Sequence, residues 1–160
     1  MIDNKLLKKV STLLKKHNLK VSTAESCTGG LIAHSLTNIA GSSNYFNHAI
    51  IAYSNNAKIN LLNISMNSLK KYGAVSKEVA KEMAYNVRTI FNDDIGISTT
   101  GIAGPTGGTL EKPVGLVYIG VSNKDKTIVK KFLFSGDRLQ NKVSTCNTAL
   151  NMVFDILIEI

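Results

Sequence analysis

The sequence of 160 residues has no Trp, two Pro, two Cys and no apolar run close to the about 18 residues that a membrane-spanning helix needs. Cys27 and Cys146 lie far apart and outside any metal-binding spacing, which argues against a zinc site and a disulfide framework. The N-terminus has the charged pattern of an amphipathic helix rather than that of a signal peptide. We therefore expect a cytoplasmic protein with no membrane association and no bound metal.

Acidic residues are also few, 11 against 19 basic ones, so that the formal net charge is +8. A basic charge of this size can mark a nucleic-acid partner. Here, however, only Arg88 and Arg138 are arginines, and the lysines occur as scattered pairs without interleaved aromatic residues. This pattern is typical of a solvated surface and disfavours nucleic acid as a partner, which stays the weaker interpretation.

The 44% of hydrophobic residues is enough for one core, and we interpret residues 1–160 as a single domain. Helical periodicity predicts helices over Lys5–His17, Asn56–Leu62, Lys77–Phe91 and Val143–Leu157. Short apolar runs predict strands over Lys20–Glu25, Tyr45–Tyr53, Ile95–Thr99, Val114–Ser122 and Thr127–Phe134, the last two as a hairpin. This order predicts an α/β fold, a three-layer α/β/α sandwich with a mixed, mostly parallel sheet of about five strands.

Four polar, glycine-rich segments are placed where we expect strands to end: Glu25–Gly30, Gly41–Ser43, Thr99–Gly108 and Ser135–Arg138. In an open α/β sheet, ligands bind in the crevice where the carboxyl ends of strands converge. One site built from all four segments is the simplest prediction.

The first segment offers a nucleophile. Ser26 follows a strand and precedes a helix, where the backbone N–H groups of Thr28 and Gly29 could face an oxyanion or a phosphate. The same serine could instead simply cap the helix. Cys27 is the rival nucleophile, because a thiol at a helix N-terminus can have a lowered pKa, although an isolated cysteine beside a strand is more often part of the core.

A serine nucleophile needs a base, and none of the three histidines lies in a polar loop. The alternative base is a lysine kept neutral by desolvation. Lys58 is the best candidate, because the segment Tyr53–Lys58 leads from a strand end into a helix. An ordinary solvated helix lysine is the other interpretation of Lys58.

Several loops could hold a phosphate through hydroxyl groups, backbone amides or a guanidinium. The candidates are Gly41, Ser42, Ser43, Thr100, Gly101 and Arg138. No loop has the spacing of a Walker phosphate-binding loop or of a dinucleotide-binding GxGxxG motif, which argues against those two classes.

Seven segments, taken in chain order, resemble one known family. They are Ala24–Gly30, Ile39–Ser43, Tyr53–Lys58, Tyr72–Ser76, Thr100–Gly108, Lys112–Gly115 and Phe134–Arg138. Together they resemble the C-terminal domain of the CinA family, the bacterial nicotinamide-nucleotide amidohydrolases (NMN deamidases, PncC), over residues 5–158.

The resemblance implies hydrolysis of the carboxamide of nicotinamide mononucleotide (NMN) to nicotinate mononucleotide and ammonia, in NAD salvage. It implies no cofactor, and it implies a homodimer or a larger homo-oligomer. By position, Ser26 would be the nucleophile, Lys58 its general base and Tyr53 a hydroxyl that orients them or relays protons between them. Gly41, Ser42, Ser43, Thr100, Gly101 and Arg138 would hold the phosphate and ribose. A neutral Lys58 requires a buried side chain, which we therefore predict.

The alternative is a non-catalytic nucleotide-binding or regulatory domain linked to competence or DNA damage. Binding a phosphate would need only the loops and Arg138, so the presence of Ser26, Tyr53 and Lys58 together favours the enzyme. Many CinA-type proteins also carry a larger N-terminal domain related to molybdopterin-binding folds. These 160 residues do not include that domain, so the resemblance does not extend to its nucleotide-hydrolysing activity.

Overall fold

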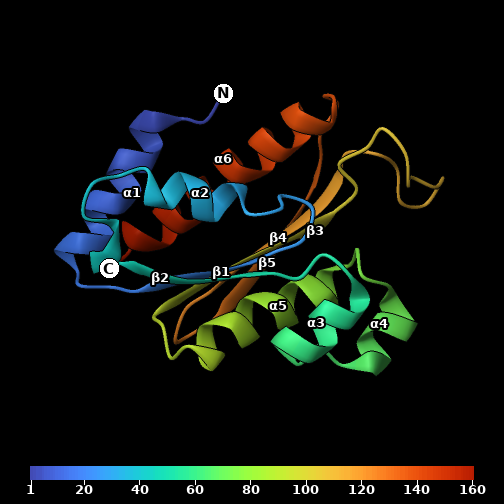
Figure 1. The fold of residues 1–160 in the computed structure, drawn as a ribbon, viewed down its shortest axis with the longest axis horizontal. Helices are drawn as coiled ribbons and strands as arrows, with labels where there is room; N and C mark the ends of the chain where they lie inside the picture. The colour runs from blue at the N-terminus through green and yellow to red at the C-terminus, as the bar shows by residue number, and fades with distance from the viewer.

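A five-stranded sheet lies between two layers of helices in the computed structural model, which describes residues 1–160 (Figure 1). The strands are β1 (Val21–Glu25), β2 (Phe46–Ile51), β3 (Ile95–Gly101), β4 (Leu116–Ser122) and β5 (Thr127–Leu133). Their order across the sheet is β2-β1-β3-β4-β5. The predicted three-layer α/β fold is confirmed.

Strand direction decides where the loops after the strands meet. β1 pairs in parallel with both β2 and β3, so that Glu25 lies opposite Ile51 and Thr99. β4 runs antiparallel to β3 and to β5, which leaves four of the five strands pointing the same way. The chain therefore leaves β1, β2 and β3 at the same edge of the sheet, and this edge carries the candidate site.

Three helices cover each face of the sheet (Figure 1). One layer consists of α1 (Asn4–Lys16), α2 (Leu31–Thr37) and α6 (Arg138–Leu157). The other consists of α3 (Asn55–Leu62), α4 (Met66–Tyr72) and α5 (Lys77–Ile90). None of these helices combines the length and apolar character needed to cross a lipid bilayer.

The larger hydrophobic core lies between the sheet and the layer of α1, α2 and α6, and a smaller one lies under α5. The helix α5 turns a stripe of buried side chains toward the sheet: Val79, Met83 and Val87. The helix approaches so closely that a Cβ at Gly96 would overlap the carbonyl of Ala84. This tight contact holds α5 against β3, and α3 packs in turn against α5 and β2.

Two element boundaries differ from the prediction in ways that matter for the site. β2 ends at Ile51, not at Tyr53, which leaves Tyr53 in the connection to α3. α6 begins at Arg138 rather than near Val143, because the Asp137 side chain accepts the backbone N–H of Gln140 and closes a capping box. Both differences place polar side chains at the same edge of the sheet.

Candidate active site

The turn after β1 is held by a buried carboxylate. Glu25, the last residue of the strand, accepts hydrogen bonds over 2.6–3.2 Å from Thr28 Oγ1 and from the backbone N–H groups of Gly30, Ile32 and Ala33. These bonds satisfy donors at the start of α2 that have no partner within the helix. The carboxylate therefore fixes the path of the turn that carries Ser26.

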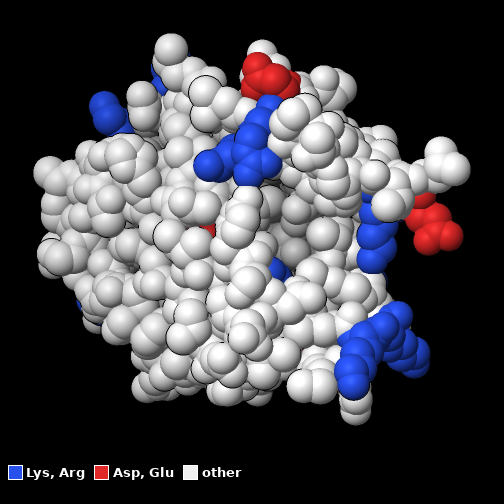
Figure 2. Space-filling view, turned by 45° about the vertical axis from the view of Figure 1, so that its right-hand side comes forward, with Lys and Arg blue, Asp and Glu red and all other residues white.

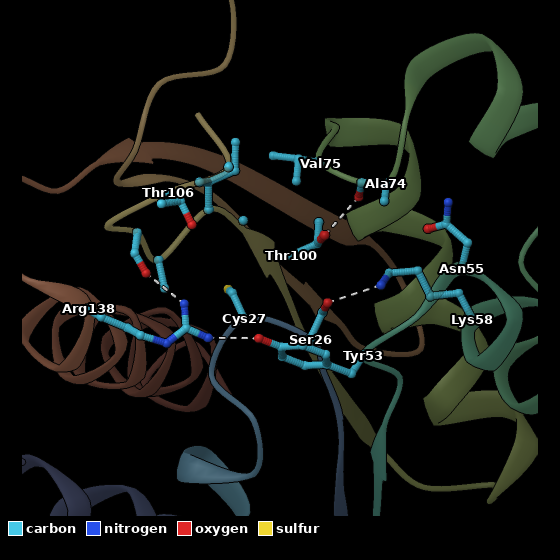
Figure 3. A pocket seen from close by; sticks show the side chains of 15 residues that line it. Ser26, Cys27, Tyr53, Asn55, Lys58, Ala74, Val75, Thr100, Thr106 and Arg138 are labelled. Carbon is cyan, nitrogen blue, oxygen red and sulfur yellow. Dashed lines mark hydrogen bonds between the residues drawn. The ribbon is translucent and has the colours of Figure 1, made fainter. Parts of the chain in front are cut away.

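The side chain of Lys58 contacts Ser26, the first residue of this turn. The Nζ atom of Lys58 lies 3.0 Å from Ser26 Oγ and donates to the carbonyl of Ala52 over 2.8 Å (Figure 3). Ser54 orients the helix that carries Lys58, because its side chain accepts the N–H of Ala57 and caps α3. The turn after β1 and the helix after the adjacent parallel strand β2 thus bring the two groups together.

The Lys58 side chain is 2% exposed, and no carboxylate lies within ion-pair distance of its Nζ atom. Burial disfavours the charged ammonium and lowers the pKa of Lys58, while the neighbouring Cys27 acts in the opposite direction. The prediction that Lys58 is buried is confirmed. A lysine in this setting can supply a neutral amine, which is what a general base for Ser26 requires.

Cys27 is buried next to Ser26, and burial raises the pKa of its thiol to about 12. The nucleophilic form of cysteine is the thiolate, which is scarce at neutral pH when the pKa is that high. Of the two interpretations of Cys27 left open by the sequence, the structure favours the buried core residue.

Two backbone N–H groups of the turn after β1 have no acceptor in the protein. Those of Cys27 and Thr28 donate to no acceptor in the protein, whereas the N–H of Gly29 donates to the carbonyl of Ser26 over 3.1 Å. Of the two N–H groups expected to face a ligand, that of Thr28 has no acceptor in the protein, and the expectation is wrong for Gly29, where the turn closes on itself. The Thr28 hydroxyl is buried between Glu25 and Thr99, so that it holds the turn rather than facing the cavity.

A cavity of about 280 Å³ opens over the Ser26–Lys58 pair. Its walls come from the loops after β1, β2 and β3, from the connection between α4 and α5, and from the start of α6. The lining residues are Ser26, Cys27, Tyr53, Asn55, Lys58, Ala74, Val75, Thr100, Gly101, Ile102, Ala103, Gly104, Thr106, Gly107 and Arg138. No acidic side chain is among them and Arg138 contributes a guanidinium, so the cavity suits an anionic ligand.

Arg138 and Tyr53 form the outer wall. The guanidinium donates to the carbonyl of Gly104 and to the hydroxyl of Tyr53, both over 2.7 Å (Figure 3). Because Lys58 contacts Ser26 directly, the Tyr53 hydroxyl does not lie between them as a relay would. Its position instead indicates that Tyr53 orients Arg138.

The structure brings six of the predicted site residues into this one cavity: Ser26, Tyr53, Lys58, Thr100, Gly101 and Arg138. Thr28 and Gly29 are not among its lining residues. Gly41, Ser42 and Ser43 are at the opposite edge of the sheet, because this loop precedes β2 rather than following it. Beside that loop, Lys15 Nζ donates a hydrogen bond to the carbonyl of Ala40. The prediction that all four glycine-rich segments line one crevice within the chain is wrong for this segment.

Some lining residues had no role in the prediction, notably Asn55, Ala74, Val75 and Thr106. Asn55 belongs to the segment that carries Lys58, so its presence had a local signal. Ala74 and Val75 lie in the segment Tyr72–Ser76, and they reach the cavity because the Thr100 hydroxyl donates to the carbonyl of Ala74 over 2.7 Å. No group of three or more His, Cys, Asp or Glu side chains is placed to hold a metal ion.

Basic side chains form separate patches on the face shown in Figure 2, and one lies inside a hollow. No continuous basic surface is visible on this face. That arrangement is in keeping with the solvated-surface interpretation of the lysines.

The fold and the cavity together define a three-layer α/β domain with a candidate serine–lysine site at the carboxyl ends of its parallel strands. The chain belongs to the CinA family: residues 3–157 match the model of the CinA C-terminal domain. The homo-oligomer that the resemblance implied stays a prediction.

Named relatives and solved structures agree with this assignment. A CinA-like protein of Kosmotoga olearia is 52% identical over 144 residues, which are 90% of this chain and 35% of that protein. A protein of Thermoanaerobacter pseudethanolicus is 51% identical over 94% of this chain and 37% of its own length. The chain thus spans a little over a third of the length of such relatives. The crystal structure of the competence/damage inducible protein CihA from Agrobacterium tumefaciens has a TM-score of 0.94 at 35% identity, with 98% of each chain covered.

Proposed function

We propose that this chain is an amidohydrolase that converts nicotinamide mononucleotide to nicotinate mononucleotide and ammonia. The observation that carries the proposal is the contact between a buried lysine without a counter-ion and a serine hydroxyl, 3.0 Å apart, at the floor of a cavity. A domain that only bound nucleotides would gain nothing from a buried, unpaired lysine, since burying an amine without a counter-ion costs free energy.

The first half of the reaction forms an acyl-enzyme. Neutral Lys58 accepts the proton of the Ser26 hydroxyl while Oγ attacks the carboxamide carbon, and the free N–H group of Cys27, which lines the cavity, is available to the oxyanion. Lys58 then gives this proton to the amide nitrogen as the C–N bond breaks. Ammonia leaves, and the nicotinoyl group remains esterified to Ser26.

The second half returns the enzyme to its starting state. Lys58, neutral again, takes a proton from water as the water oxygen attacks the ester carbon. The C–O bond to Ser26 breaks, and Lys58 returns the proton to Oγ. The product is the carboxylate, with its remaining proton released to solvent.

The charge of the cavity supports a mononucleotide as substrate. Arg138 lies on the side of the cavity opposite Lys58, so a ligand can place an anionic group at one end and an amide at the other (Figure 3). A guanidinium is well suited to phosphate because its N–H groups match the spacing of phosphate oxygens. The substrate class implied by the family resemblance has this arrangement of groups.

The direct test is ammonia release from nicotinamide mononucleotide by the purified protein and by two variants of adjacent residues. We expect turnover by the wild type, none above background for Ser26→Ala, and nearly full turnover for Cys27→Ala. Loss in Cys27→Ala alone would indicate a cysteine amidase. Nucleotide binding without turnover by the wild type would favour the regulatory domain instead.

A further inference from the structure

A second hollow lies directly beyond Arg138. It is open to solvent, has a volume of about 560 Å³ and shares Ala103 and Arg138 with the candidate active site. The two cavities therefore have the guanidinium as a common wall, and a ligand held by Arg138 can extend into both.

The two cavities differ in chemistry. The first presents the polar groups of Ser26, Lys58 and Thr100, whereas Pro105, Val114 and Leu139 give the second an apolar surface. Leu139 is 66% exposed although it is a large hydrophobic residue. An apolar side chain left in solvent beside a charged anchor favours a ligand with a flat or apolar group next to an anion.

The guanidinium of Arg138, which both cavities share, has N–H groups that donate to no acceptor in the protein. Arginine carries five N–H groups, and Arg138 uses two of them for the Gly104 carbonyl and the Tyr53 hydroxyl. The remaining groups can hold a phosphate between the two cavities. The anchor at the junction is cationic, so the part of the ligand that crosses it is the anionic part.

Asp137 adds a polar group to the second hollow. Its Oδ1 atom accepts the N–H of Gln140, and Oδ2 has no hydrogen-bond partner in the protein. A free carboxylate oxygen beside an apolar surface suits a sugar hydroxyl or an exocyclic amino group. This combination matches a nucleoside better than it matches an aliphatic chain.

We propose that the hollow formed by Pro105, Val114, Asp137 and Leu139 is a second subsite, which binds a nucleoside joined through phosphate to the nucleotide in the first cavity. The ligand class is a dinucleotide with phosphate groups at Arg138. This inference rests on the proposed function, because that function sets which end of the ligand lies at Ser26.

The test compares the dissociation constants of a mononucleotide and a dinucleotide. The probes are nicotinamide mononucleotide and oxidised nicotinamide adenine dinucleotide, titrated calorimetrically into a Ser26→Ala protein so that turnover does not interfere. Leu139→Ser is then added, with Leu133→Ser as its matched control. Both leucines are 66% exposed, but Leu133 does not line the hollow.

We expect the dinucleotide to bind at least as tightly as the mononucleotide. Leu139→Ser should raise the Kd of the dinucleotide by about 5- to 10-fold, as loss of part of a leucine contact predicts, and should leave that of the mononucleotide within about 2-fold. Leu133→Ser should change neither.

The proposal is overturned if the dinucleotide binds more weakly than the mononucleotide, or if Leu139→Ser and Leu133→Ser affect it equally. Ammonia release by the wild type separates this failure from that of the proposed function. If the wild type turns over the mononucleotide but Leu139→Ser does not weaken dinucleotide binding, the subsite alone is overturned. Absence of both turnover and binding overturns the two together.

Discussion

Two hydrogen-bonded pairs face the same cavity, and each joins a basic side chain to a hydroxyl. Lys58 Nζ donates to Ser26 Oγ over 3.0 Å, and the Arg138 guanidinium donates to the Tyr53 hydroxyl over 2.7 Å. The inner pair is almost fully buried, with Lys58 2% and Ser26 8% exposed, whereas Tyr53 is 61% exposed. Burial lowers the pKa of Lys58, and an arginine stays charged in either setting. Similar contacts thus suit different tasks, proton transfer inside and anion binding outside.

Breaking the inner pair should have the largest effect. Lys58→Met keeps the length of the side chain but removes the amine, and we expect kcat to fall about 1,000-fold or more. Lys58→Arg is the second variant, because a guanidinium still carries N–H donors but stays protonated and cannot act as a base. Steady-state ammonia release measures both, and a Lys58→Met protein within about 10-fold of the wild type would contradict a role for the amine in catalysis.

Breaking the outer pair should affect binding more than chemistry. Arg138→Ala removes the donors for an anionic group, and we expect KM to rise about 10- to 100-fold with a smaller change in kcat. Arg88→Ala removes the only other arginine, which lies on α5 outside the cavity, and should leave KM unchanged. Equal effects of the two substitutions would count against an anion site at Arg138.

Tyr53→Phe separates the two roles considered for this hydroxyl. If Tyr53 orients Arg138, its loss removes one hydrogen bond and raises KM about 2- to 5-fold while kcat is kept. A proton relay would behave in the opposite way, with kcat falling about 100-fold and KM little changed. The ratio of the two parameters in this variant decides between them.

The smallest expected effect is on folding. Because the pKa of Lys58 is lowered in the folded state, the unfolded chain binds this proton more readily, and stability rises with pH up to the ordinary lysine pKa of 10.5. Lys58→Met removes this dependence. Urea unfolding should therefore show the variant gaining stability over the wild type at neutral pH, with the gain shrinking as the pH approaches 10.5. A difference independent of pH would contradict the lowered pKa.

The sequence predicted the inner pair better than the outer one. Ser26 directly follows β1 and Lys58 lies in α3, the helix that follows the parallel strand β2, so strand direction brings both to one edge. The bond between Tyr53 and Arg138 joins residues far apart in the chain, and neither local periodicity nor a cap signals it.

The loop Gly41–Ser43 shows that amino-acid composition alone does not predict which loops line the site. Its small polar residues look like those of the true site, but it enters β2 instead of leaving it, and this places it at the other end of the sheet. The connection between α4 and α5 shows the converse, because Ala74 and Val75 carry no chemical signal and line the cavity through the packing of α5 on the sheet.

The pH dependence of kcat/KM for nicotinamide mononucleotide tests whether neutral Lys58 is the base, because this parameter reports the ionisation of the free enzyme. No histidine lines the cavity, and the pKa of Cys27, about 12, puts the titration of this thiol above the pH range in which we expect the rise. We predict that kcat/KM rises with pH and reaches its plateau below the ordinary lysine pKa of 10.5, and that this rise is absent from the residual activity of Lys58→Arg. A rise that persists in Lys58→Arg, or one that begins only near 10.5, would contradict a buried neutral lysine as the base.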